Sequence, residues 1–257
     1  MVVDRTPFHP LDHGWPDQPG DTGTLSVVGP HVGVAMTVHD SLTGALDDDG
    51  RLLVDTHIDV RRGDPSRTWV VAHVVDIADA PAVGDTVRLR VDAGRRTALS
   101  RGHSACHLAA LALNETTARF WSKEPPRRDS RGFPFLDQIA IQTSRISPGA
   151  SYDAYRAGKS LRKAGFDAEA FLAESDAVTQ EAAALLDTWV AAAVPSRVET
   201  DGDPTLSARR QWWCDVPGGP AVIPCGGTHV SDLGALGRVR IAVARSDDGF
   251  EVRTTAE

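Results

Sequence analysis

The chain has 257 residues, of which 41% are hydrophobic and 24% are charged, and its formal net charge is −8 at pH 7. This length allows one or two domains with buried cores, and no run approaches the roughly 20 apolar residues of a membrane-spanning helix. The first residues lack the basic start and apolar stretch of a secretory signal, so we expect a soluble, cytoplasmic protein with no membrane partner. Three cysteines are too few for a disulfide framework.

The first 94 residues predict β structure. Valine-rich apolar runs are separated by Gly, Pro and Asp clusters, which is the pattern of short strands. The runs are Thr24 to Val28, Val32 to Val38, Leu52 to Val60, Thr68 to Ile77 and Thr86 to Asp92. We therefore expect an α+β protein in which residues 1–94 form a small β-barrel-like domain and residues 95–257 form a second domain with an inserted basic segment at 115–163.

A helical pattern begins beyond residue 95. Leu99 to Asn114 has the composition and spacing of a buried helix. Glu115 to Gly149 is charged and contains four prolines, which predicts an inserted loop with short helical pieces. Asp167 to Val194 reads as two helical stretches divided near Ser175 to Ala177. Strands of a second sheet are expected at Ser196 to Glu199, Gln211 to Val216 and Arg238 to Ala244.

The negative charge is concentrated in the N-terminal part. Residues 1–94 hold 7 basic and 15 acidic residues, whereas residues 95–257 hold 20 of each. Within the second part, residues 115–163 carry 10 basic and 5 acidic side chains. This excess suits contact with nucleic-acid phosphates, and a solvated surface loop is the alternative. The candidate contacts are Arg127, Arg128, Arg131, Lys159, Arg162 and Lys163.

Two pairs of residues predict a metal site. His103 and His107 are four apart on the expected helix, which places both imidazoles on one face, although two core or surface histidines would give the same spacing. Cys225 and His229 are also four apart, within the sequence PCGGTHV. Two or three histidines with one cysteine suit zinc, so we expect one Zn²⁺ here. Four protein ligands leave no tetrahedral vacancy, so the ion expands its coordination, or one residue releases it or holds a water instead.

The sequence RGHSACHL followed by PCGGTHV resembles the HxxxH and CxxxH motifs of the alanyl-tRNA synthetase editing domain, the second additional domain of threonyl- and alanyl-tRNA synthetases, and its freestanding AlaX relatives. Val83 to Arg96 and Val216 to Val230 are similar to the family's approaches to the two pairs, and Ala164 to Asp167 is similar to its RFDF strand. The resemblance covers nearly the whole chain except Glu115 to Gly149. It implies a metal-dependent deacylase that acts in trans on aminoacylated tRNA.

The resemblance also implies roles for two further residues. Gln18 would be a hydrogen-bonding residue at the pocket mouth, and Thr228 would orient ligands or substrate. The family's N-terminal glycine-rich motif appears here as FHPLDHGWPDQPGDTG, with a longer DHGWPD before Gln18. Trp15 and Pro16 in this stretch would change how it covers the pocket, so two identities of the amino acid that is removed stay open. It is serine or glycine on a tRNA(Ala)-like substrate, or a threonine-like or non-standard amino acid.

Two other functions fit the same residues. One is a non-catalytic, zinc-stabilised tRNA-binding module, and the other is a metal-dependent hydrolase of small aminoacyl or acyl esters. The activity of a tRNA-dependent enzyme should fall when Arg127 and Arg128 are replaced and when the salt concentration rises, whereas the activity of a small-ester hydrolase should not change. No obligate protein partner is inferred.

Some residues near the motifs have a structural interpretation. Cys106 is expected to be a small apolar filler that faces away from the ligands, and Cys214 has no partner at metal spacing. His73 alternates with apolar residues and is expected to be structural. The pair Trp212 and Trp213 is more typical of a core than of a base-stacking surface.

Overall fold

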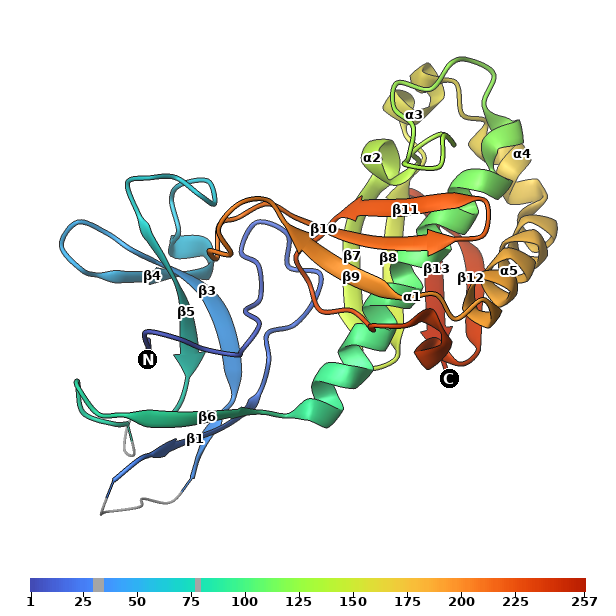
Figure 1. Cartoon of the computed structure of the whole chain (residues 1–257). Coiled ribbons are helices and arrows are strands. Elements are labelled where there is room, and N and C mark those ends of the chain that lie inside the picture. The colour runs from blue at the N-terminus through green and yellow to red at the C-terminus, as the bar shows by residue number, and fades with distance from the viewer. Residues whose placement is uncertain (30–34, 77–79) are drawn as a thin grey trace. The chain divides into compact units, whose positions relative to one another are not determined.

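The computed structural model describes residues 1–29, 35–76 and 80–257 (Figure 1). The chain divides into two compact units, one made of residues 1–96 and 201–208 and the other of residues 97–200 and 209–257. The mixed α and β character expected from the sequence is confirmed. In the described part of the chain, no helix is long and apolar enough to cross a membrane.

The first unit contains two open, three-stranded antiparallel sheets. One has the order β2-β1-β6, formed by Met36–Val38, Gly23–Val27 and Val87–Val91. The other has the order β4-β3-β5, formed by Leu52–Val54, Asp40–Leu46 and Thr68–Val74. Across residues 1–29 and 35–76 and from residue 80 onward these sheets do not close, so the predicted barrel-like domain is not observed.

The strand predictions for this unit were partly wrong. The run from Leu52 to Val60 ends as a strand at Val54, because Asp55 takes a positive φ of 51° and begins the 3-10 helix η1, Asp55–His57. Strand β3 was missed since it lies between two others and buries Ser41 and Thr43 on alternating positions, so its sequence lacks an apolar alternation. Residues 32–34 and 77 of two predicted runs lie outside the described residues.

The second unit is built around helix α1, Ala93–Thr116, which enters it at residue 97. One antiparallel sheet has the order β11-β10-β9, formed by Gly219–Pro224, Arg210–Val216 and Ser196–Thr200. The other has the order β12-β13-β8-β7, formed by Val239–Ser246, Gly249–Ala256, Ala150–Arg156 and Ile141–Ser147. Figure 1 shows α1 running past both sheets.

Helix α1 approaches the turn between β7 and β8 very closely. A methyl group on Gly102 would lie 2.5 Å from the backbone oxygen of Ser147, a distance that no side-chain carbon tolerates, so only glycine fits at this crossing. Further along the helix, Leu108 and Leu111 are buried in the core of this unit. Each fully buried leucine contributes about 1.5–3 kcal/mol of transfer free energy, so α1 is anchored along its length.

Smaller helices complete the second unit. They are α2 at Asp137–Ala140, α3 at Lys159–Ala164, α4 at Ala168–Ala173, α5 at Ser175–Ala191, and the 3-10 helices η3 at Ala118–Phe120 and η4 at Leu233–Leu236. Helix α5 packs on β12 and buries Leu186 and Trp189. The predicted division of this helical region falls at Glu174, between α4 and α5.

Two predictions for this region were wrong. The segment Glu115 to Gly149, expected to be a loop with helical pieces, also contains strand β7. The segment Ala164 to Asp167 is not a strand, because Gly165 caps the end of α3 with a φ of 106° and Asp167 caps the start of α4 by accepting from the Ala170 N–H. Strands β8, β11 and β13 were not predicted from the sequence. Each is hydrogen-bonded along its length to a neighbouring antiparallel strand.

Candidate metal centre

Four side chains of the second unit converge on one point. The ligand atoms of His103, His107, Cys225 and His229 all lie within 4.8 Å of one another. The Cys225 Sγ atom is 3.4 Å from His103 Nε2 and 3.4 Å from His229 Nε2. A tetrahedral zinc ion with its usual Zn–S and Zn–N bond lengths would separate sulfur from nitrogen by about 3.5 Å. The donors therefore stand at the spacing that a single zinc ion requires.

The two halves of this cluster come from different kinds of element. Helix α1 supplies His103 and His107, whose ring centroids are 4.7 Å apart because residues four apart share a helix face. The tight turn after β11 supplies Cys225 and His229. Within this turn the backbone N–H of Gly227 donates to Cys225 Sγ at 3.3 Å, a contact that favours the thiolate form which zinc binds.

Two serines of α1 hold that turn against the helix, and the sequence analysis missed both. Ser104 Oγ accepts from the Val230 N–H at 3.1 Å and lies 3.2 Å from His229 Nδ1, which leaves His229 Nε2 on the cluster side. Ser100 Oγ donates to Thr228 Oγ1 at 2.9 Å. A signal was present, since the two serines lie four apart and share the helical stripe of His103.

His107 meets the main requirement of a metal ligand. Burial lowers the pKa of His107 to about 3, so the imidazole is neutral at physiological pH. Its buried Nε2 atom has no hydrogen-bond partner in the part of the chain that the structure describes. A bond to a metal ion would satisfy this nitrogen, and the donor set as a whole fits zinc.

The tryptophan pair divides between two environments. Trp212 is fully buried, as expected, and its ring lies 5.4 Å from that of His107 and 5.5 Å from that of His229. It thereby forms an aromatic wall beside two of the candidate metal-ligand imidazoles. Trp213 lies on the opposite face of β10, where the Arg197 guanidinium stacks 3.8 Å from its ring centroid.

The two residues assigned by resemblance lie in different units. Thr228 belongs to the turn that carries Cys225 and His229, and its oxygen accepts from Ser100. Gln18 belongs to the first unit, where it is 1% exposed and its backbone N–H donates to the Asp17 carboxylate. Its glycine-rich stretch is tied down by Asp21, a buried carboxylate that accepts from the His9 N–H and pairs with Arg96.

The six candidate nucleic-acid contacts fall into two groups. Arg127 donates to Gln138, Arg128 pairs with Glu124, and Arg131 pairs with Glu115. Arg131 also stacks over the Trp189 ring and its side chain is only 4% exposed. By contrast, three exposed residues of α3 have no ion pair within the described ranges, namely Lys159, Arg162 and Lys163.

The remaining cysteines do not join the cluster. The Cys106 thiol lies 3.4 Å from the Asp153 carboxylate on β8, so it faces a polar group and the prediction of an apolar filler was wrong. Burial and the nearby Asp153 charge raise the pKa of Cys106 well above its usual value. Cys214 is buried in β10, where burial and Asp215 raise its pKa to about 12. His73 is bonded to Thr6 and to the Met1 carbonyl, which is the expected structural role.

Comparison with known proteins gives relatives of two kinds. The chain is 28% identical over 265 residues to an alanine–tRNA ligase of Acidothermus cellulolyticus, covering 98% of this chain and 23% of the ligase. It is 29% identical over 245 residues to the ligase of Chlorobaculum tepidum, covering 94% of this chain and 23% of that protein. It is also 22% identical over 240 residues to the alanyl-tRNA editing protein AlaX-M of Pyrococcus horikoshii, covering 93% of this chain and 78% of AlaX-M.

No protein-family model matches the chain. The chain spans less than a quarter of the length of these ligases and about three quarters of AlaX-M. The ligase alignments and the AlaX-M alignment each run over nearly the whole of this chain, so they span the positions of the four candidate metal donors. These similarities support the editing-domain family of alanyl-tRNA synthetases and AlaX proteins that the two motifs indicate.

Proposed function

We propose that this protein hydrolyses, in trans, the ester bond that joins a wrongly attached amino acid to tRNA, with one zinc ion held by His103, His107, Cys225 and His229. The convergence of four zinc-type donor atoms within 4.8 Å carries this proposal. It is supported by the likeness to an alanyl-tRNA editing protein and to alanine–tRNA ligases. The substrate is an aminoacylated tRNA.

The chemistry needs little beyond a Lewis acid, a positioned nucleophile and a selective pocket, because an aminoacyl ester already has an electrophilic carbonyl. Zinc, when bound, supplies the Lewis acidity and lowers the pKa of a water toward ~7. The chain's own part is to hold the donors in their binding forms. Burial keeps His107 neutral, the Gly227 N–H supports the Cys225 thiolate, and Ser104 orients His229.

Thr228 is the proposed substrate-orienting residue next to the donors. Thr228 directly precedes His229 in the turn that carries two of the donors, and Ser100 Oγ donates to Thr228 Oγ1 at 2.9 Å. We assign the Thr228 hydroxyl, held in place by Ser100, to orienting a substrate oxygen beside the cluster. Gln18 is assigned, from the family resemblance, to hydrogen bonding at the mouth of the substrate pocket.

The amino acid removed is proposed to be serine, glycine or a threonine-like residue, including a non-standard one. The stretch before Gln18 is longer than in the family's glycine-rich motif and contains Trp15, whose side chain is exposed. An added bulky ring in this stretch changes the shape of the surface that selects the amino acid. For this reason the test uses a panel of tRNAs charged with different amino acids.

The decisive experiment measures amino-acid release from tRNAs charged with serine, glycine, alanine, threonine and a non-standard threonine analogue, using zinc-loaded and chelator-treated protein. We expect zinc-dependent release of one amino acid, and loss of that release in Cys225→Ala and His103→Ala. Cys214→Ala removes a buried thiol of the same unit outside the cluster and should retain release. Full release by both cluster variants, or no release from any charged tRNA, would overturn the proposal.

A further inference from the structure

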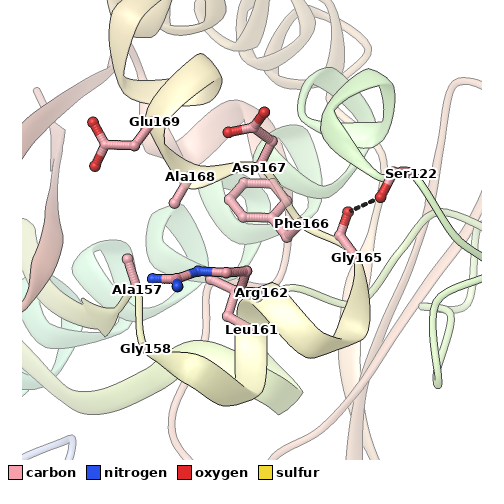
Figure 2. A pocket seen from close by; sticks show the side chains of 10 residues that line it. All are labelled: Ser122, Ala157, Gly158, Leu161, Arg162, Gly165, Phe166, Asp167, Ala168 and Glu169. Atoms are coloured by element: carbon pink, nitrogen blue, oxygen red, sulfur yellow. Dashed lines mark hydrogen bonds between the residues drawn. The ribbon is translucent and has the colours of Figure 1, made fainter.

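A hollow of the same unit, lined by none of the four candidate metal donors, lies between α3, the start of α4 and the segment around Ser122 (Figure 2). Its volume is about 360 Å³, within the range of small-ligand pockets. Leu161 and Phe166 form its apolar floor and are 1% and 2% exposed. Gly165 and Ser122 close one side, where the Gly165 carbonyl accepts from both the N–H and the hydroxyl of Ser122.

The charged groups that line this hollow differ in whether an oppositely charged group neutralises them. Glu169 is paired with Arg245 through two contacts of 2.9 and 3.1 Å, so its charge is already matched. One oxygen of Asp167 accepts from the Ala170 N–H and caps α4. Arg162 reaches across the hollow in Figure 2 and has no ion pair within the described residues. The hollow therefore offers one unmatched cation and one carboxylate at its edge.

The positive charge continues along the surface beside the hollow. Lys159, Arg162 and Lys163 stand at positions i, i+3 and i+4 of α3, which places them on one side of this short helix. Lys123 packs beside Gly165, and Arg156 packs beside Gly158. Among the described residues none of these five side chains forms an ion pair. Such a row attracts consecutive phosphates, whereas a single small anion would use only one or two of these cations.

We propose that this hollow receives one unpaired nucleotide of the tRNA, with its phosphate against Arg162, its base over Leu161 and Phe166, and a base amino group donated to the Asp167 carboxylate. An apolar floor, a cation and a carboxylate acceptor together match the three parts of a nucleotide. The row of cations on α3 favours a polynucleotide over a free nucleotide. This inference rests on the proposed function, which makes tRNA the substrate.

The test is binding of uncharged tRNA, followed by fluorescence anisotropy over a series of salt concentrations. Arg162→Ala should weaken binding roughly 3–10-fold and reduce the slope of log K against log salt by about 1. Ala157→Leu, which narrows the hollow without changing charge, should weaken binding and leave the slope unchanged. The matched control is Arg240→Ala, which removes an exposed arginine of β12 that pairs with Glu257 and does not line the hollow, and this variant should bind normally.

Two results would overturn the assignment of the hollow. One is wild-type tRNA affinity in both Arg162→Ala and Ala157→Leu, with thermal unfolding and zinc content confirming that the variants fold. The other is equal affinity for adenosine or guanosine monophosphate and for tRNA, which would identify a free nucleotide as the occupant.

The two proposals fail independently, because binding is measured with uncharged tRNA. If charged tRNA is not hydrolysed but both variants weaken tRNA binding, the deacylase assignment fails and the nucleotide site stands. If hydrolysis is zinc-dependent but both variants bind tRNA normally, only the nucleotide site fails.

Discussion

Replacing Ser104 by alanine should weaken zinc binding although Ser104 is not a ligand. The Ser104 hydroxyl is fully buried, accepts from the Val230 N–H and lies 3.2 Å from His229 Nδ1. Without this hydroxyl the His229 imidazole is no longer held in one orientation. The loss of such a supporting contact lowers metal affinity by about 10–100-fold, which corresponds to about 1.4–2.7 kcal/mol of binding free energy. The Val230 N–H loses its partner as well, which costs the metal-free protein about 1–3 kcal/mol of unfolding free energy.

Both quantities can be measured on the same variant. Zinc affinity follows from competition with a coloured chelator, and unfolding free energy follows from denaturant titration of the metal-free protein. Ser100→Ala is the matched control, because it removes the same hydroxyl from the same helix but breaks a contact to Thr228 instead of to a ligand. We expect Ser100→Ala to lose less zinc affinity than Ser104→Ala, because Ser100 helps to hold the turn but contacts none of the four donors. Equal zinc affinity in Ser104→Ala and the wild type would refute the reasoning.

Three further predictions concern stability. Burial raises the pKa of Asp137 from 3.8 to about 6, so ionisation of this carboxyl group opposes folding. The resulting loss of unfolding free energy is absent below about pH 3.8 and reaches its full size, at most about 3 kcal/mol, above about pH 6. Asp137→Asn should therefore be more stable than the wild type at pH 7 and lose that advantage by pH 4 in denaturant titrations, and no pH dependence of the difference would contradict this. Gly102→Ala should lose at least about 2 kcal/mol of unfolding free energy, because the added methyl group clashes with the β7–β8 turn. The control Gly94→Ala on the same helix meets no atom closer than 3.5 Å and should be neutral or stabilising. Equal denaturation midpoints for the two variants would count against the close approach. Asp21→Asn breaks the ion pair of a buried carboxylate with the partly exposed Arg96 and should cost about 1–3 kcal/mol, against less than about 0.5 kcal/mol for the exposed Asp76→Asn. Similar losses at the two sites would show that the Asp21 pair is not stabilising.

The candidate site was more predictable than its surroundings. His103 with His107, and Cys225 with His229, are each four apart, and a four-residue separation can be recognised in the sequence whatever the rest of the fold does. What brings the pairs together is not local. Ser104 reaches Val230 across 126 residues, and no spacing rule connects two such positions.

The fold was predictable where burial follows a simple period. Strand β5 begins at its predicted residue, Thr68, and helix α1 contains the whole of its predicted range, with six more residues at its start and two at its end. Strand β3 and strand β8 were missed because each buries polar side chains, such as Ser41 in β3 and Asp153 in β8, which break the apolar alternation. Their partners in the sheet, and not their own composition, make them strands.

The separation of the two metal-binding pairs along the chain has a consequence for biosynthesis. His103 and Cys225 are 122 residues apart, so a ribosome that has released α1 still has to synthesise nearly half of the chain before the second pair emerges. Until then the nascent chain contains only His103 and His107 of the four candidate donors. The proposed zinc site can therefore be completed only after Cys225 and His229 have been synthesised, and a chain truncated before Cys225 lacks half of the donor set.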